Sequence, residues 1–150
     1  YLPNYRGKHP IHWAILEGKK DFGITCHRIG SKIDHGPIIW QKKIILRKKY
    51  LDFKFVRKKL LEAIPENFFK KRYKQSNIPP LRIYLRKIKP LDSKILKSDL
   101  YDKEYLKRKI NLFSTSKYPC YLIIKKKKYF IKSLLSLKNY NLKTTYDQKS

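Results

Sequence analysis

The sequence predicts an α/β fold, in which the later part of an open α/β sheet is followed by a small α+β or barrel-like unit. Three observations support this prediction. A short helical pattern after Pro10 precedes two β-branched segments, apolar residues recur at helical spacing after Asp52, and a different pattern begins beyond the prolines at 79–80. At 150 residues, the chain is long enough for one domain, or for one compact unit with a small appended one.

The first part of the chain is predicted to form a helix, a strand, a loop and a second strand. Pro10 suits a first helical position, and Gly18 suits the position just beyond a helix end. FGITCHRI at 22–29 and IIWQKKIIL at 38–46 are rich in β-branched residues, as strands are, and IDHGPII between them predicts a turn. Trp13 and Trp40 are interpreted as core residues.

A second helix is predicted from Asp52 to about Gln75, with Asp52 as its N-cap. Pro65 should bend or break it into two segments. The apolar residues at helical spacing are Phe55, Leu60, Leu61, Ile64 and Phe68.

The remainder predicts a linker, a helix and a hairpin. The linker is SNIPPL, because two consecutive prolines prevent regular structure. The amphipathic helix lies within SDLYDKEYLKRKINLF, with Ser98 or Asp99 as its cap, and the hairpin is YPCYLIIKKKKYFI with a lysine-rich turn. The polar tail begins at about Asn139.

The composition is strongly basic, with 38 Lys and Arg against 11 Asp and Glu and a formal net charge of +27. This balance predicts an anionic partner, such as nucleic acid, a nucleotide-linked substrate or an acidic membrane surface. However, Lys, Ile, Tyr and Asn are all abundant and the lysines are spread along the chain, which is also typical of genome bias. We favour the bias and leave a role in binding open.

Cys26 and Cys120 form no CxxC pair, which predicts reduced thiols and a cytoplasmic protein. No His/Cys cluster has the spacing of metal ligands, so no metal site is predicted. The chain contains no apolar run of about 18 residues, so no membrane span is predicted. Because Met is absent, including at the first position, we interpret the chain as a fragment that lacks its N-terminal part.

Four pieces of the first 46 residues agree in order and spacing with one enzyme family: LPNYRG, HPIHWAILEG, GITCHRI and IDHGPIIWQ. They resemble the formyltransferases that use 10-formyltetrahydrofolate, which include glycinamide ribonucleotide, methionyl-tRNA and sugar-nucleotide formyltransferases. RKIKPLDSKI and YPCYLIIKKKKYFI resemble the C-terminal region of the methionyl-tRNA and sugar branches, so the glycinamide ribonucleotide branch drops in rank.

The resemblance implies a division of the chain. The first half would be the C-terminal part of a Rossmann-like formyltransferase sheet. The expected parts are the C-terminal portion of a formyltransferase catalytic domain (1–75), a linker (76–81), a formyltransferase C-terminal-like unit (82–138) and a tail (139–150).

The resemblance implies that Asp34 is the family's catalytic aspartate. The family's catalytic Asn and His would precede Tyr1, in the missing N-terminal part, so we expect the fragment alone to be inactive. Formyl transfer to an amine passes through a tetrahedral intermediate, which needs a donor for the oxyanion and a route for the amine's proton. In the family, the aspartate favours the charged form of the histidine. Without the resemblance, Asp34 two residues before Gly36 would be interpreted as a turn residue.

The resemblance also implies binding residues. The loop that wraps the pterin of the folate would comprise His27, Arg28, Ile29, Gly30, Ser31, Lys32 and Ile33. His27 is expected to orient this loop, and a plain solvated position for Lys32 stays open. The loop beneath the acceptor would comprise Tyr5, Arg6, Gly7 and His9. Arg6 suits a phosphate or carboxylate, or ties the loop to the fold; His9 and His12 are more often structural than catalytic.

The predicted function is transfer of a formyl group from 10-formyltetrahydrofolate to a primary amine, with the amino group of a sugar nucleotide favoured as acceptor. His9 and His12 flank Pro10 where methionyl-tRNA enzymes more often have Ala-Ala-Pro-Ile-Gln, which mildly disfavours tRNA. Two alternatives remain. One is methionyl-tRNA formyltransferase, and the other is a non-catalytic basic scaffold that binds nucleic acid.

Overall fold

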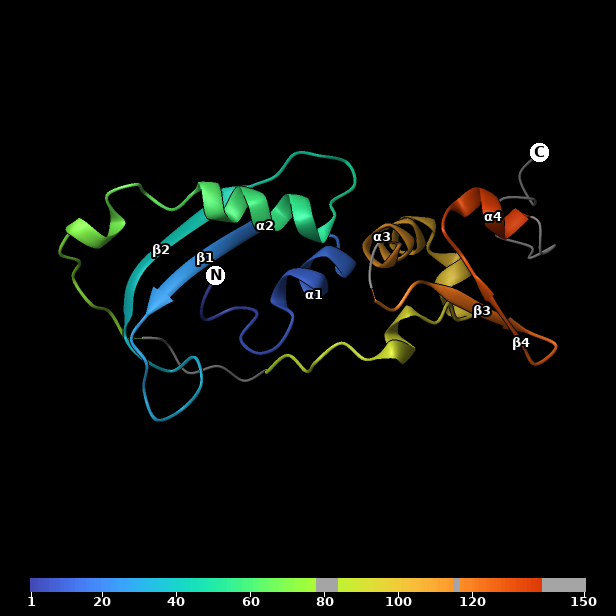
Figure 1. The fold of residues 1–150 in the computed structure, drawn as a ribbon, viewed down its shortest axis with the longest axis horizontal. Helices are drawn as coiled ribbons and strands as arrows, with labels where there is room; N and C mark the ends of the chain where they lie inside the picture. The colour runs from blue at the N-terminus through green and yellow to red at the C-terminus, as the bar shows by residue number, and fades with distance from the viewer. Residues whose placement is uncertain (78–83, 115–116, 139–150) are drawn as a thin grey trace.

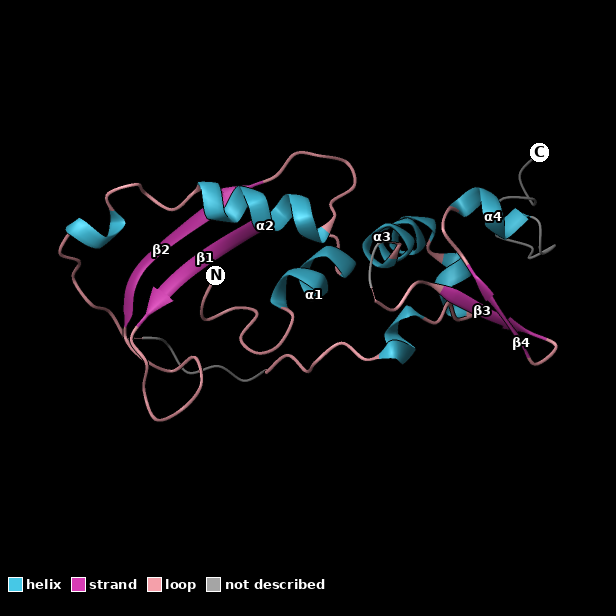
Figure 2. Cartoon of the chain, viewed as in Figure 1, coloured by secondary structure: helices cyan, strands magenta, loops and turns pink. Residues whose placement is uncertain are grey.

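The computed structural model describes residues 1–77, 84–114 and 117–138, and its elements form two groups along the long axis of the molecule (Figures 1 and 2). The first group contains α1 (Pro10–Leu16), β1 (Asp21–His27), β2 (Ile38–Ile45) and α2 (Phe53–Glu62). The second contains α3 (Lys103–Phe113), β3 (Tyr121–Ile124), β4 (Lys127–Phe130) and α4 (Leu134–Lys138). The predicted mixed α/β class is confirmed.

β1 and β2 form an antiparallel pair in which Phe22 lies opposite Ile44 and Cys26 lies opposite Trp40. The register shifts between Cys26 and His27, so that His27 pairs with Ile38 at the end of the ladder. α2 runs across this pair of strands in Figure 1. The ladder therefore ends in an irregular step just where the loop between the two strands begins.

α1 joins the two groups. It begins at Pro10, and Gly18 follows its end with a φ of 76°, so both predicted end signals are confirmed. Its residues Ala14, Ile15 and Leu16 are buried, and the helix contacts both α2 and α3. The buried side chains of the two groups consequently form a single apolar cluster.

α2 is shorter than predicted. The Asp52 carboxylate accepts a hydrogen bond from the Phe55 amide at 2.9 Å, which confirms the N-cap. The helix ends at Glu62, three residues before Pro65, and the chain then forms a separate 3-10 turn at Phe68–Lys70. Pro65 has no amide hydrogen to donate, so the helix does not continue toward Gln75.

The predicted cap of α3 was wrong. Asp102 accepts a hydrogen bond from the Tyr105 amide at 2.8 Å, and the helix begins at Lys103. Asp99 is instead buried, where its carboxylate lies 2.7 Å from the Lys109 ammonium and accepts a bond from the Leu96 amide. Ser98–Tyr101 forms a 3-10 turn before the helix.

The predicted hairpin is confirmed. β3 and β4 are antiparallel, and Lys125 and Lys126 form the connecting turn with φ values of 47° and 66°. Positive φ at both central residues is typical of a tight two-residue hairpin. The predicted linker residues 78–81 and the tail at 139–150 lie outside the described residues.

Both tryptophans, interpreted as core residues, are half-buried; Trp13 packs against the core cluster, whereas Trp40 does not belong to it. The Trp13 indole nitrogen donates to the Arg86 carbonyl at 2.9 Å, and the Arg86 guanidinium lies 4.8 Å from its ring centroid. Trp40 contacts Phe68 edge to face at 5.5 Å. Indole rings keep their N–H accessible to a partner, so Trp13 serves as a link between α1 and the segment that contains Arg86.

Both cysteines are free thiols. Within the described ranges, no helix is long and apolar enough to cross a bilayer.

Removing the buried cation of α3 should destabilise the fold strongly. Lys109→Met would leave the Asp99 carboxylate buried without its ammonium partner, and such losses cost about 3–5 kcal/mol. Lys107→Met is the matched control, because Lys107 pairs with the exposed Glu104 on the same helix, and exposed pairs contribute about 0–1 kcal/mol. Urea unfolding measures both values, and equal losses would contradict the role of the buried pair.

Acid should weaken the contact between α1 and α2. The His12 ring packs on Phe53 with centroids 4.7 Å apart, and burial, assisted by His9, lowers the pKa of His12 below its ordinary value. The folded state therefore disfavours protonated His12, so the free energy of unfolding should fall as the pH drops below about 6.5. Unfolding curves between neutral and mildly acidic pH measure this slope. His12→Phe keeps the ring and should flatten it, and an unchanged slope would refute the assignment.

Candidate active site

The loop between β1 and β2, residues 28–37, is closed at its base. The Arg28 amide donates to the Pro37 carbonyl at 2.9 Å. A Cβ placed on Gly36 would lie 1.7 Å from the Arg28 carbonyl oxygen, so only glycine permits the two ends to approach this closely. The loop therefore leaves and re-enters the sheet at a defined point.

Asp34 and His27 face each other across this loop. The His27 Nε2 atom lies 3.6 Å from Asp34 Oδ1, and both side chains are partly buried. The other ring nitrogen, Nδ1, lies 2.8 Å from the Arg28 carbonyl oxygen, which can only accept a hydrogen bond. Nδ1 must then carry a hydrogen, so the contact of Nε2 with Asp34 is attractive only when a further proton lies between them. The hydrogen bond at Nδ1 therefore leaves Nε2 as the ring atom that faces Asp34.

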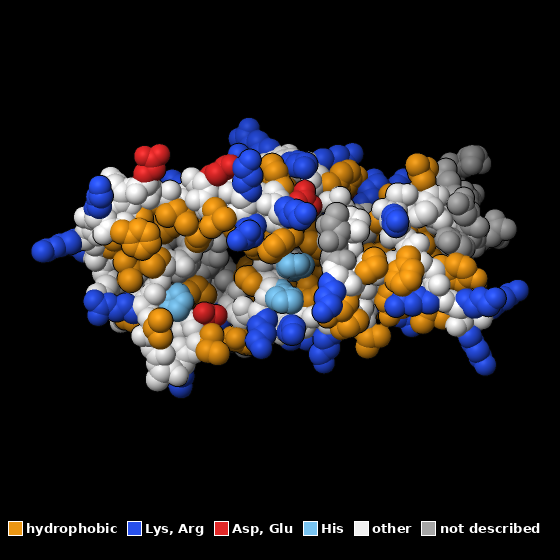
Figure 3. All heavy atoms as spheres, viewed as in Figure 1, with side chains coloured by type: hydrophobic (Ala, Val, Ile, Leu, Met, Phe, Trp, Pro, Cys, Tyr) orange, Lys and Arg blue, Asp and Glu red, His pale blue; other side chains and the backbone are white. Residues whose placement is uncertain are grey.

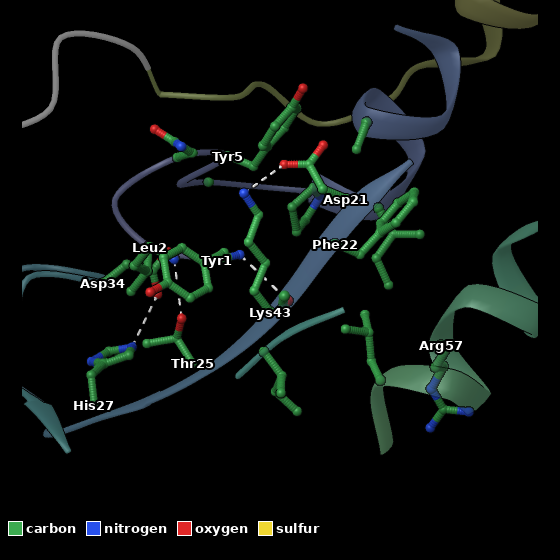
Figure 4. A pocket seen from close by; sticks show the side chains of 18 of the residues that line it. Tyr1, Leu2, Tyr5, Asp21, Phe22, Thr25, His27, Asp34, Lys43 and Arg57 are labelled. Atoms are coloured by element: carbon green, nitrogen blue, oxygen red, sulfur yellow. Dashed lines mark hydrogen bonds and ion pairs between the residues drawn. The ribbon is translucent and has the colours of Figure 1, made fainter. Parts of the chain in front are cut away.

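A pocket of about 490 Å³ opens beside this pair (Figure 4). In Figure 4, His27 and Asp34 point toward one another, and Asp21 and Lys43 form a second charged pair. The polar lining of the pocket includes Asn4, Asp21, Thr25, His27, Asp34, Lys43 and Arg57. Its apolar walls include Pro10, Ile11, Ala14, Phe22, Ile24 and Leu60. The arrangement suits a ligand with both an apolar body and polar groups.

All four predicted acceptor residues lie in the segment before α1, and the side chains of Tyr5 and His9 face different neighbours. Tyr5 lines the pocket, and its hydroxyl donates to the Glu17 carboxylate; burial and this acidic neighbour raise the pKa of Tyr5 above its usual range. His9 has a left-handed backbone, and its Nδ1 accepts a hydrogen bond from the Ile88 amide at 3.3 Å. His9 does not belong to the pocket lining. The two side chains are thus held by different neighbours.

Arg6 and Gly7 hold the N-terminal segment in place. Arg6 is buried, and its Nη1 lies 2.7 Å from Nε2 of His35, a residue of the 28–37 loop. Its Nε is buried and has no hydrogen-bond partner among the described residues. Gly7 bridges to Leu85, and its φ of 114° together with a 2.4 Å approach of a virtual Cβ to the Leu85 carbonyl requires glycine. The geometry matches the second predicted role of Arg6, which is to tie the loop to the fold.

The predicted folate-binding residues are mostly exposed. Ile29 and Ile33 are 98% and 72% exposed, although both are large and apolar. Gly30, Ser31 and Lys32 between them are exposed as well. Such a surface costs hydration free energy unless a ligand or another segment covers it.

Several lining residues were missed by sequence reasoning. Asp21 and Lys43 pair at 3.0 Å across the strands, and the hydrogen bond from Lys43 lowers the pKa of Asp21. Thr25, which lines the pocket, accepts a hydrogen bond at 3.0 Å from Gln41, which does not belong to the lining and also donates to the Leu2 carbonyl at 2.6 Å. The β1–β2 register places Thr25 directly opposite Gln41, whereas Asp21 lies opposite Ile45 and reaches Lys43 diagonally. In the part of the chain that the structure describes, no three His, Cys, Asp or Glu side chains form a metal-binding group.

The loop closure should depend on Gly36 and not on Gly30. Gly36→Ala places a methyl group against the Arg28 carbonyl and should displace Asp34 from His27. Gly30→Ala is the matched control, because its nearest neighbour lies 3.7 Å away, an ordinary contact. Amide hydrogen exchange at Arg28 should be faster only in Gly36→Ala, and equal protection in both variants would contradict this closure.

Comparison with known proteins relates the chain to one family. Residues 1–68 match the family model described as formyl transferase. The bifunctional polymyxin resistance protein ArnA of Wigglesworthia glossinidia brevipalpis is 46% identical over 48 residues, which are 32% of this chain and 7% of that protein.

Two solved structures share the fold. Methionyl-tRNA formyltransferase from Clostridium thermocellum matches 82% of this chain and 54% of its own, with a TM-score of 0.65 and 21% identity. A sugar N-formyltransferase from a Shewanella species matches 88% of this chain and 57% of its own, with a TM-score of 0.62 and 16% identity. The chain therefore spans little more than half of these structures. Residues 1–68 are therefore similar to the formyl transferase family, and the fold continues to follow that of formyltransferases beyond this segment.

Proposed function

We propose that the protein transfers a formyl group from 10-formyltetrahydrofolate to a primary amine. The observation that carries this proposal is the Asp34–His27 pair at the mouth of a pocket, within the segment that matches the formyl transferase family. Asp34 also has a left-handed backbone, with a φ of 56°. This backbone belongs to a turn that is closed by a hydrogen bond from the His35 amide to the Lys32 carbonyl at 3.3 Å, and the turn fixes the position of Asp34 in the loop.

Asp34 is the proposed catalytic residue and His27 its positioning residue. The attacking amine must lose a proton during transfer, and an unprotonated Asp34 carboxylate can receive it. His27 is anchored through Nδ1 to the Arg28 carbonyl, which directs Nε2 toward Asp34. His27 thereby acts on Asp34 as well as on the loop, which extends the role expected from the sequence.

The exposed loop fits the folate co-substrate. Ile29 and Ile33 present apolar surface, and Gly30 between them leaves backbone groups open to a flat heterocycle. When bound, the folate supplies the formyl group. The chain's part is to hold the ring system on residues 28–33 and to keep Asp34 beside the pocket.

Completion of the site by a preceding segment is part of the proposal. The oxyanion formed during transfer needs a positioned donor, and we assign it to the Asn and His that the family carries ahead of the Leu-Pro-x-Tyr-Arg-Gly segment. The apolar walls of the pocket, including Phe22, Ile24 and Leu60, would pack against that segment. We accordingly keep residues 1–75 as part of a catalytic domain and 82–138 as a C-terminal unit.

A sugar nucleotide is the proposed acceptor, and methionyl-tRNA is the second candidate. Both kinds of enzyme share the fold, with TM-scores of 0.65 and 0.62, so the fold does not discriminate between them. The sequence pieces favour the sugar, because His27-Arg28 followed by Lys32 resembles the aminoarabinose branch. Tyr5 and Gly7 line the pocket where the acceptor would enter.

Formyl transfer should require Asp34 and an upstream segment. The protein extended upstream of Tyr1 in its own reading frame should formylate an amino-sugar nucleotide in preference to methionyl-tRNA. Asp34→Asn should lower kcat/KM at least about a hundredfold, as loss of one catalytic polar group does. The 150-residue chain alone should show no detectable transfer. The measurement is transfer of labelled formyl from 10-formyltetrahydrofolate to each acceptor.

Two further variants separate catalysis from folding. Asp21→Asn is the matched control, since this second pocket carboxylate is paired with Lys43 and should leave kcat nearly unchanged. His27→Gln should lower kcat more than folate affinity if His27 positions Asp34. Activity of the 150-residue chain would refute the proposed completion of the site, and preference for methionyl-tRNA would reverse the ranking. Folate binding without transfer to either acceptor would favour a scaffold.

A further inference from the structure

The acidic residues are distributed unevenly along this basic chain. Every Asp and Glu except Asp147 lies at or before Glu104. The lysines continue beyond that point, with a run of four at 125–128 flanked by Lys117 and Lys132. Genome bias explains many lysines, but it does not by itself explain why acidic residues are absent from this stretch.

The lysines of the two parts of the chain differ in whether a carboxylate lies close to them. In the earlier part of the chain, Lys43, Lys48 and Lys59 each lie within 4.0 Å of a carboxylate. For the four lysines at 125–128, the described residues contain no ion pair. All four are exposed and lie at or beside the turn between β3 and β4. Their charges are consequently available to an external anion.

One face of the hairpin adds apolar surface to this charge. Tyr121 lies opposite Phe130 and Ile123 lies opposite Lys128, so these four side chains share one face of the two-stranded sheet. Ile123 is 49% exposed and Phe130 is 53% exposed. The Lys128 ammonium lies 3.9 Å from the Tyr121 ring centroid and 5.0 Å from that of Phe130. A cation therefore sits directly among apolar groups.

The hairpin projects from the end of the molecule that is farther from the pocket. Figure 1 shows its turn at the extremity beyond α3, opposite the end that carries the β1–β2 loop. In the space-filling view, Lys and Arg side chains extend from this end among hydrophobic ones (Figure 3). The turn and the exposed face can thus meet a flat surface without covering the candidate active site.

We propose that the β3–β4 hairpin docks the protein on a bilayer that contains anionic lipids. The lysines of the turn attract the lipid phosphates, and Phe130 and Ile123 enter the boundary between headgroups and acyl chains. An anionic lipid surface fits better than nucleic acid. Ile123 cannot stack on a base, and the cations are lysines, which lack the planar fork that reads phosphates and bases in pairs. The inference is independent of formyl transfer.

The test is flotation of the 150-residue chain with lipid vesicles. It should bind vesicles of equal parts phosphatidylcholine and phosphatidylglycerol, and not vesicles of phosphatidylcholine alone. Lys125→Asn with Lys126→Asn removes two charges and keeps the turn, because Asn tolerates positive φ. Binding should weaken about 25-fold, or about fivefold per lysine. Phe130→Ser should weaken it about tenfold, even in high salt, because the apolar contribution is not screened.

The matched control is Lys71→Asn with Lys74→Asn. These lysines are also exposed and lie on irregular backbone outside the hairpin. Binding that survives this change and is lost with the hairpin changes would support the proposal. Equal losses would overturn it in favour of diffuse charge. Failure to bind the anionic vesicles would also overturn it. So would binding of single-stranded RNA that Phe130→Ser weakens and that added vesicles do not displace.

Discussion

The burial of α1 is the constraint on which the rest of the structure depends. Ala14, Ile15 and Leu16 are consecutive buried residues, so the helix is covered on more than one side. One side meets α2 and another meets α3, and the two groups of elements therefore share a core. The segment before α1 inherits its position from this packing. Backbone hydrogen bonds join this segment to Leu85. These bonds hold the residues around Leu85, which belong to the C-terminal half, next to the segment before α1.

Local signals predicted the elements better than their ends. Pro10, Asp52 and Gly18 act through their own backbone or a neighbour three residues away, so their roles could be read directly. The cap of α3 could not, because Ser98, Asp99 and Asp102 are all suitable cap residues. The two aspartates differ in burial. Asp99 pairs with Lys109 inside the fold, whereas Asp102 caps the helix. That contact joins residues ten positions apart and depends on tertiary packing.

In the candidate site, too, the sequence indicated individual residues but not the contacts between them. Asp34 was predicted from its place in a spaced set of motifs, and the structure places it beside the pocket. Its contact with His27 depends on how the intervening loop folds back, which no local propensity specifies. The contact of Arg6 with His35 spans 29 positions and is equally non-local. Resemblance identifies which residues can matter, whereas loop closure decides which of them meet.

Positive φ at residues other than glycine occurs in three described segments: before α1, in the 28–37 loop and in the β3–β4 turn. Tyr5, His9 and Asp34 all have positive φ, a conformation that costs of order 1–3 kcal/mol for a residue other than glycine. Each has a partner that holds it: Glu17 for Tyr5, the Ile88 amide for His9 and His27 for Asp34. Lys125 and Lys126 share this conformation, but there it follows from the geometry of a tight hairpin. Asp34 also lies in a turn, because the His35 amide donates to the Lys32 carbonyl at 3.3 Å and places Asp34 at the third turn position, where positive φ is typical. The turn therefore sets the backbone of Asp34, and the way the 28–37 loop folds back brings its carboxylate to His27.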